Sequence, residues 1–423
     1  MTQAVNKIKL VLGDVVLRRR ILFTLLMLAL FRLLAAIPLP AIDKARFAAY
    51  FSQNEFLGLL NLFSGGGLSN VSIILLGVGP YITASIIMQL LTIMSPKLKA
   101  LYQEEGEAGR RKFTMYSRFL TVPLALVQAL GFITLFKSQG IIGDLTGTPL
   151  FTSVVIMTAG SLLLMWIGEL MTEFGIGNGV SVLIFAGIVS SLPSSILQFK
   201  SLFNVADIPT YIGLLILAVL VTAAVVVITE AERPIPVTYA KQVKGNKVYG
   251  GVSTYIPLRL NQAGVIPIIF ALSILLLPQM IVNFAGQFHA VWFDFIAKGV
   301  QYVIGNQVIY AILYFVLIFF STYFYTAVTF DPEKIAENLQ RSGAFIPGVR
   351  PGSPTVDYLG KVATRLTLFG ALFLGVVAIV PLVIQNIPGM SFLAIGGTAL
   401  LIVVSVVIDL LKKLDAQASM REY

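Results

Sequence analysis

The feature that most constrains this chain is a series of apolar stretches, each close to the length that an α-helix needs to cross a lipid bilayer. A crossing helix requires about 20 apolar residues. Their length and lack of alternation favour helices over strands, since lipid tolerates no open sheet edge. The sequence therefore predicts an all-α membrane protein with ten transmembrane helices, at 21–38, 71–94, 119–136, 151–171, 180–198, 209–229, 263–284, 305–328, 366–385 and 392–411.

The composition agrees with this prediction and excludes several kinds of protein. Only 12% of the 423 residues are charged and 57% are hydrophobic, whereas soluble domains carry about 25% charged residues. There is no cysteine and a single histidine, His289, which argues against a disulfide, a thiolate metal site or a histidine proton relay. The glycine runs at 65–67 and 175–179 lack the features of a phosphate-binding loop. We therefore expect no catalytic residue, no metal and no cofactor.

The distribution of basic residues orients the chain in the membrane. Of the 30 Lys and Arg residues, 24 fall before residue 21, in the loops 95–118, 230–262 and 330–365, or in the C-terminal tail. The opposite side holds five, and Arg32 lies inside the first apolar stretch. Because basic residues concentrate on the cytoplasmic side, we expect both termini in the cytoplasm. Topology then explains the net charge of +10, and DNA binding is not needed to account for it.

Two shorter segments lie outside the ten stretches. Residues 4–17 repeat apolar side chains at helical spacing, which is typical of an amphipathic helix on the cytoplasmic leaflet, although a loosely ordered leader fits equally well. Residues 56–70 are apolar but too short to span the membrane. Such a segment is either re-entrant or buried in the protein, and its small residues favour burial in a cavity.

The large basic loops have compositions that indicate local structure. The stretch 230–262 is hairpin-like, with a glycine turn at Lys244-Gly245-Asn246. The stretch 330–360 has a short helical pattern from Asp331 to Arg341, followed by a run rich in Gly and Pro. These loops suggest docking of a cytoplasmic partner; the alternative is that their cations only fix the topology.

Six short blocks, ordered along nearly the whole chain, carry a family resemblance. They are GPYITASII at 79–87, GEAGRRK at 106–112, GIGNG at 175–179, NQAGVIP at 261–267, GAFIPGVRPG at 343–352 and GGTALLIVV at 396–404. Together they resemble bacterial SecY, the family of pore subunits of the Sec protein-conducting channel. The resemblance implies two inverted five-helix halves around a central hourglass pore. Residues 1–200 would hold the amphipathic helix, a plug and the first five spans, and residues 201–423 the last five spans with two large cytoplasmic loops.

The resemblance also implies the residues that line and close the pore. The pore ring would consist of Ile82, Ile86, Ile184, Ile188, Ile269 and Ile402. Such a hydrophobic ring dewets and blocks ions, yet it offers a passing polypeptide no specific hydrogen bonds. The plug, seated outside the ring, would include Leu59, Leu60, Asn61, Leu62, Phe63 and Ser64, with a hinge at Gly65, Gly66 and Gly67.

A sideways exit and a docking surface follow from the same resemblance. Gln89, Thr92 and Asn261 would hydrogen-bond to hold shut a lateral gate between the second and third spans and the seventh and eighth. The cations that face a cytoplasmic partner would be Arg110, Arg111, Lys112, Arg259, Arg341 and Arg350. The implied partners are SecE, SecG, SecA, the ribosome, preproteins that carry signal sequences, and membrane lipid.

The function expected from these observations is a passive, gated conduit for unfolded polypeptide in the bacterial inner membrane, which also releases hydrophobic segments sideways into lipid. It would not be an enzyme, since SecA or the ribosome would supply the energy. A secondary transporter of a small solute is one alternative, but it needs polar groups at the midplane, where Arg32 is the only clear charge. A membrane scaffold is another, and it would need neither ring nor plug.

Overall fold

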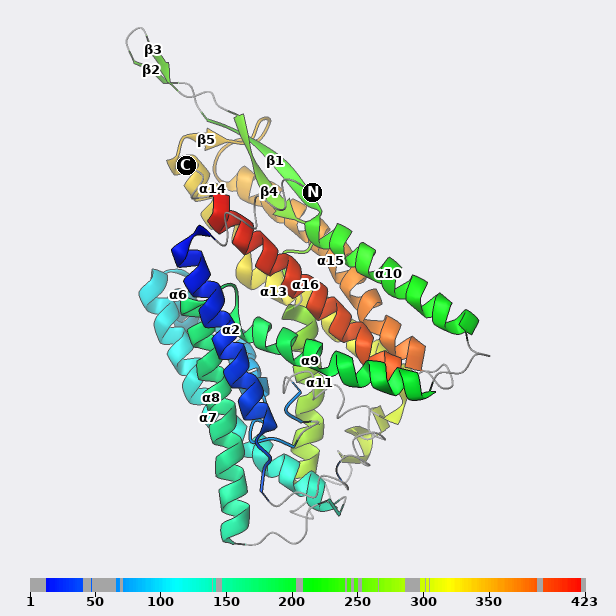
Figure 1. Cartoon of the computed structure of the whole chain (residues 1–423). Helices are drawn as coiled ribbons and strands as arrows, with labels where there is room; N and C mark the ends of the chain where they lie inside the picture. Colours follow the sequence, from blue (N-terminus) through cyan, green and yellow to red (C-terminus); the bar gives the residue numbers. More distant parts are fainter. Residues whose placement is uncertain are drawn as a thin grey trace.

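The computed structural model describes residues 13–40, 47, 66–68, 71–138, 140–141, 147–202, 208–239, 242–244, 247–249, 253–264, 266–285, 297–300, 302–303, 305–385 and 391–419. Long helices account for most of them and pack side by side (Figure 1). They are α2 (Val15–Ala36), α5 (Gly79–Met94), α7 (Gly106–Ser138), α8 (Thr148–Phe174), α9 (Gly179–Leu202), α10 (Ile208–Glu230), α11 (Ile266–Ala285), α13 (Gln307–Thr329), α15 (Ser353–Gln385) and α16 (Ser391–Ser419). Each overlaps one predicted stretch, so the prediction of helices instead of strands is confirmed.

Several of these helices are long and apolar enough to cross a membrane unaided. Within the described residues these are α7, α8, α10, α15, and α13 together with the short helix α14 (Pro332–Arg341). The bent pair of α5 and α6 (Pro96–Gln103) makes a further span if the two are counted as one. The other predicted stretches coincide with α2, α9, α11 and α16. The chain is therefore a multi-pass membrane protein.

The second predicted stretch begins later than expected. Residues 71–78 form turns, and helix α5 starts only at Gly79. Val71 and Gly77 have φ angles of 48° and 60°, which lie in the left-handed region and interrupt a right-handed helix. Pro80 stands in the first helical turn, where its missing N–H costs nothing. The prediction of helix over 71–78 is therefore wrong, because turn conformations override the apolar composition.

The turns at 71–78 are hydrogen-bonded to the segment that follows α2. The Leu39 N–H donates to the carbonyl of Val71 at 2.8 Å, and the Ile73 N–H donates to the carbonyl of Ile37 at 3.0 Å. Buried backbone groups need such partners, since an unpaired one costs free energy comparable to a lost hydrogen bond. The segment after α2 thereby fixes one side of the approach to α5.

Helix α8 fixes the other side of this approach. The Ser161 hydroxyl donates to the carbonyl of Gly77 at 2.9 Å. One residue earlier, Gly160 permits close contact, because a Cβ there would overlap the carbonyl oxygen of Ile73. The start of α5 is therefore held by α8 as well as by the segment after α2.

A small antiparallel sheet lies at one end of the helices. Its strands are β1 (Glu232–Tyr239), β4 (Ser253–Arg259) and β5 (Ala344–Phe345), in the order β4-β1-β5. Beyond β1, strand β2 (Gln242–Lys244) pairs with β3 (Lys247–Tyr249), and Lys244 lies opposite Lys247. Both pairs, β1 with β4 and β2 with β3, are antiparallel, so the predicted hairpin over 230–262 is confirmed. Gly245 and Asn246 of the predicted glycine turn lie outside the described residues.

The sheet joins the two large loops into one unit, which we call the platform and define as residues 231–260 and 331–365. Asp331 caps α14, its carboxylate accepting the N–H groups of Glu333 at 3.1 Å and Lys334 at 3.2 Å, so the predicted short helix is confirmed. Apolar residues of both loops pack onto the first turns of α15: Ile235, Val237, Leu258, Ala344, Ile346, Leu359, Val362 and Leu366. Figure 1 shows the platform at the end of the molecule where α2 begins and α16 ends.

The close approach at Gly160 leads to a stability prediction. Gly160→Ala should destabilise the protein by about 1–3 kcal/mol, because the added methyl group meets a backbone carbonyl that cannot rotate away. The measurement is thermal unfolding of the detergent-solubilised protein. Gly213→Ala on α10 is the matched control, since nothing lies within 4 Å of its Cβ position. Equal melting temperatures for the two variants would contradict the prediction.

Candidate functional site

Helices from both ends of the sequence converge on one hydrophobic cluster, which we call the waist. From the first half of the chain it takes buried residues of α2, α8 and α9 and the residue before α5. From the second half it takes buried residues of α11, α13, α15 and α16. Residues as far apart in the sequence as Phe31 and Ile402 therefore share one core.

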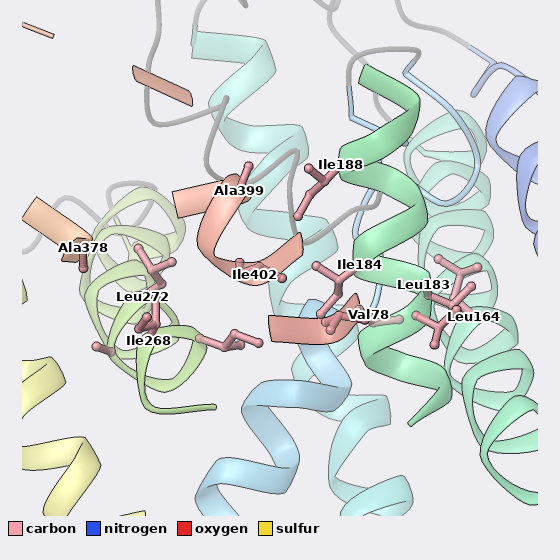
Figure 2. Close-up of a cluster of buried hydrophobic side chains, with 14 of the residues drawn as sticks. Val78, Leu164, Leu183, Ile184, Ile188, Ile268, Leu272, Ala378, Ala399 and Ile402 are labelled. Atoms are coloured by element: carbon pink, nitrogen blue, oxygen red, sulfur yellow. The ribbon is translucent and has the colours of Figure 1, made fainter. Parts of the chain in front are cut away.

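Figure 2 shows how the centre of the waist is arranged. Ile402 of α16 lies between Ile184 and Ile188 of α9 on one side and Ile268 and Leu272 of α11 on the other. Side chains from three helices thus face a common centre, and all of these residues are buried. The side chains labelled in this contact are all apolar (Figure 2), and the wider waist also includes the buried phenol of Tyr314.

Most of the predicted ring residues meet in the waist. Ile184, Ile188, Ile269 and Ile402 are 2%, 3%, 8% and 1% exposed and belong to it, and the half-buried Ile82 packs against it. Ile86 is also buried, at 7% exposed, but it lies outside this cluster. The structure therefore brings together five of the six residues and places the sixth elsewhere on α5.

Other members of the waist were not singled out from the sequence. Val78 is the N-cap of α5 and is buried, but the helix predicted from residue 71 concealed its special position. Leu272 lies four residues after Ile268, and Ala399 lies three before Ile402, so each shares a helix face with another waist residue. Helical spacing was the available signal, but ordinary core residues repeat with the same spacing.

The described part of the proposed plug hinge packs against α9. Gly66 has a φ of +83°, and a Cβ there would lie 3.2 Å from Ser190 Oγ and 3.7 Å from the carbonyl of Gly187. At Gly67 a Cβ would meet the carbonyl oxygen of Ile74 at 2.9 Å. Both positions therefore require glycine, one for its backbone angle and both for close packing. The remaining plug residues, 59–65, lie outside the described residues, as do His289 and residues 1–12.

The three predicted gate residues form local hydrogen bonds. The Thr92 hydroxyl donates to the carbonyl of Gln89 at 2.6 Å, and Asn261 Nδ2 donates to the carbonyl of Gly264 at 3.0 Å. Oε1 of Gln89 and Oδ1 of Asn261 are buried without a hydrogen-bond partner. The expected bonds between these three side chains are thus not formed in this structure, because a threonine in a helix readily bonds a carbonyl of its own preceding turn. Helix α11 nevertheless packs against both α5 and α7.

An ion pair that the sequence did not reveal joins α7 and α8. Arg118 Nε donates to Glu169 Oε1 at 2.8 Å, and the Tyr81 hydroxyl of α5 donates to the same oxygen at 3.5 Å. The Glu169 side chain is 16% exposed and that of Arg118 is 50% exposed. The carboxylate therefore links three helices next to Ile82, the residue that follows Tyr81.

The predicted docking cations differ in how they are engaged. Arg110, Arg111 and Lys112 are exposed on the first turns of α7. On the platform, Arg259 Nε pairs with Glu232 Oε1 at 3.6 Å, and Arg341 Nη2 pairs with Glu337 Oε1.

Within the described residues Arg350, unlike Arg259 and Arg341, pairs with no carboxylate. It is exposed, and within the described residues its guanidinium has no hydrogen-bond or ion-pair partner. Its backbone is fixed, because the Thr355 hydroxyl donates to its carbonyl at 2.9 Å, and Gly348 and Gly352 on either side adopt φ angles of 82° and 95°. A rigid turn thus presents a free guanidinium at the surface of the platform.

The described residues offer no metal site. No group of three or more His, Asp or Glu side chains comes together in that part of the chain. The described residues combine an apolar waist, a basic platform and long apolar helices, which are the parts expected of a membrane channel.

Comparison with known proteins identifies the family of this chain. The sequence model of the SecY family matches residues 72–411, and the chain belongs to that family. The protein translocase subunit SecY of Streptomyces coelicolor is 43% identical, with 96% of each chain covered. The protein translocase subunit SecY of Pseudomonas aeruginosa is 44% identical, covering 96% of this chain and 91% of that protein.

Solved structures show the same fold. A structure of a protein-conducting channel matches with a TM-score of 0.67 at 19% identity, and Sec61 in a canine ribosome–channel complex from the endoplasmic reticulum matches with a TM-score of 0.64 at 18% identity. Each comparison covers 97% of this chain and 94% of the other. The chain is thus a translocase subunit with a channel fold, and it is not itself an enzyme.

The contact between Arg118 and Glu169 yields a second prediction. Glu169→Gln should lower the free energy of unfolding by about 1 kcal/mol, because the charge-assisted bond is lost while the half-exposed Arg118 stays hydrated. Thermal unfolding in detergent measures the change. Glu173→Gln, an exposed position one turn further along α8, is the control and should have no effect. An effect of the same size at both positions would argue against the three-helix link.

Proposed function

We propose that this chain is the pore-forming subunit of a bacterial protein translocation channel, through which unfolded polypeptides cross the membrane. The observation that carries the proposal is the waist, where isoleucines of α9, α11 and α16 meet. Family membership and the names of the related translocase subunits support it. The chain itself is passive, and the energy comes from a partner.

The chemistry of the waist suits a seal that must open for a polypeptide. A narrow apolar constriction excludes water and therefore ions, since neither finds polar partners there. Ile82, Ile184, Ile188, Ile269 and Ile402 form this ring in our proposal. Branched side chains can part around a polypeptide without breaking hydrogen bonds, so opening carries little specific cost. Ile86, outside the cluster, would line the path next to the ring.

We assign ten membrane crossings and two halves to the chain. The ten long helices, each overlapping one apolar stretch, support the crossings. The halves 1–200 and 201–423 then contain five crossings each, and an odd number forces a repeated half to be inverted. With the basic platform in the cytoplasm, the start of α2 and the end of α16 lie on the cytoplasmic side of the inner membrane (Figure 1).

The plug and the lateral gate remain parts of the proposal. Gly66, packed against α9 close to Ile188, and Gly67, packed against Ile74, would form the hinge of the plug together with Gly65. The gate would open between α5 and α11, which touch each other. The buried acceptors of Gln89 and Asn261, which lack partners in the described residues, would make that seam easy to part and allow hydrophobic segments into lipid.

The platform is the proposed docking surface for SecA or the ribosome, and SecE and SecG are the proposed membrane partners. Arg350 is its main contact, since a fixed turn presents its exposed guanidinium, which has no partner within the described residues and can bind a carboxylate or a phosphate. Arg259 and Arg341 would have to exchange their present carboxylate partners. Arg110, Arg111 and Lys112 on α7 would extend the contact. Preproteins with signal sequences are the transported substrates.

The ring is tested by ion leakage. Replacing both Ile188 and Ile402 by serine should raise the resting conductance of the reconstituted channel in planar bilayers several-fold, because hydroxyl groups allow the waist to hold water. Ile212→Ser on α10 is the control, since that side chain is exposed on the outer surface. Unchanged conductance in the double variant would contradict the ring.

The docking role of Arg350 is tested by transport. Arg350→Glu should reduce SecA-driven translocation into reconstituted vesicles by tenfold or more, since it turns an attraction into a repulsion at the contact. Membrane assembly should be normal, because the side chain has no structural partner among the described residues. Gln340→Glu, an exposed position on α14, adds a negative charge to the same platform and should leave transport intact. Normal transport by Arg350→Glu would refute the assignment.

A further inference from the structure

A cavity that has no part in the translocation path opens where the platform meets the helices. Its volume is about 480 Å³, and it is lined by Pro332 at the start of α14 and by one face of the first turns of α15. On that face Asp357, Lys361, Thr364 and Arg365 line it. Its α15 wall therefore combines three charged side chains and a hydroxyl with apolar surface, to which Val356 and Gly360 contribute.

The charges in this cavity are available for a ligand. Lys361 and Arg365 are exposed, and neither side chain has an ion-pair or hydrogen-bond partner within the described part of the chain. They lie four residues apart, so they stand on one helix face one turn apart. Asp357 contributes one carboxylate, which leaves the lining with a charge of +1. A lining with this net charge suits a ligand with a single negative charge, such as a phosphodiester. The ammonium and the guanidinium can both donate hydrogen bonds to the phosphate oxygens.

The cavity lies at the platform end of the apolar helices, at the depth where lipid headgroups are found. Arg365 immediately precedes the apolar run 366–385 of α15. On the neighbouring helix, α13 ends at Thr329, and Pro332 of the cavity begins α14. The connection from α13 to α14 and the first turns of α15 thus both lie at the boundary between the apolar helices and the platform. Basic pockets at such positions on the cytoplasmic side bind anionic headgroups.

An apolar stripe continues from the cavity along the same face of α15. Leu368, Phe369, Leu372 and Val376 follow Arg365 at spacings of three to four residues and are exposed, Phe369 at 64%. The opposite face of α15 is buried against α13 and α16. The stripe is therefore placed to accept acyl chains below a headgroup held in the cavity.

We propose that this cavity is a binding site for an anionic phospholipid. Lys361 and Arg365 hold the phosphate, the Thr364 hydroxyl lies beside it, and the acyl chains run along Leu368, Phe369 and Leu372. The site adds a lipid ligand to the chain and does not depend on the pore: it requires only that the chain spans the membrane with the platform on the cytoplasmic side.

The test uses the full chain in detergent, titrated with dioctanoyl phosphatidylglycerol and followed by native mass spectrometry. Replacing both Lys361 and Arg365 by glutamine should weaken binding about 25-fold, the product of roughly fivefold for each cation. Binding of dioctanoyl phosphatidylcholine should not change. The control, Lys97→Gln with Lys99→Gln, removes the same charge from α6 and should retain full affinity. Equal affinity in the cavity variant and the control would overturn the proposal.

Two further arms separate a lipid from a free anion and from misfolding. Phe369→Ala with Leu372→Ala shortens the stripe without opening an internal cavity, since both side chains are exposed, and it should weaken binding of the lipid by about tenfold or more. Inorganic phosphate should not displace the lipid. Displacement by phosphate, together with full affinity in the stripe variant, would show a free-anion site and overturn the proposal. The swap Lys361→Arg with Arg365→Lys keeps both charges and should bind lipid at near-normal affinity; loss of binding there would refute the charge-based mechanism.

Discussion

The absence of water from the bilayer is the constraint on which the rest of this structure depends. Every backbone N–H and C=O in the apolar layer needs a partner within the protein, so the chain crosses as helices and leaves helical geometry only where it is covered. Residues 71–78 show this directly. Their backbone bonds to the segment after α2 and to Ser161 of α8, and that fixed set of turns delivers Val78 and the start of α5 to the waist.

Apolar and charged groups are separated in the molecule: the apolar groups meet in the waist, and the cations lie on the platform and at the helix ends. The waist joins branched apolar side chains from α9, α11 and α16 (Figure 2). The cations gather on the platform and at the ends of the helices, where water or lipid headgroups can solvate them. Some are neutralised internally, as Arg259 is by Glu232, while Arg350, Lys361 and Arg365 keep their charge available for partners outside the chain.

Local signals predicted local structure well. The apolar stretches predicted the helices, the glycine turn predicted the hairpin of β2 and β3, and Asp331 predicted the start of α14. The start of α5 was misplaced because composition does not reveal a left-handed backbone. The bonds expected between the gate residues failed for a similar reason: the hydroxyl of Thr92 had a carbonyl of its own helix within reach, and nothing in the sequence ranks that bond against a distant one.

The sequence by itself determined that the chain enters lipid, that it does so as helices, and which loops carry the positive charge, because hydrophobicity, helical length and charge are properties of contiguous residues. It also carried the resemblance that pointed to the family. Only the tertiary structure decided which isoleucines meet in the waist, that Ile86 stays outside it, and that Arg118 reaches Glu169. Contacts of this kind depend on how separate helices rotate and pack against one another, and helical spacing within a single segment leaves that rotation open.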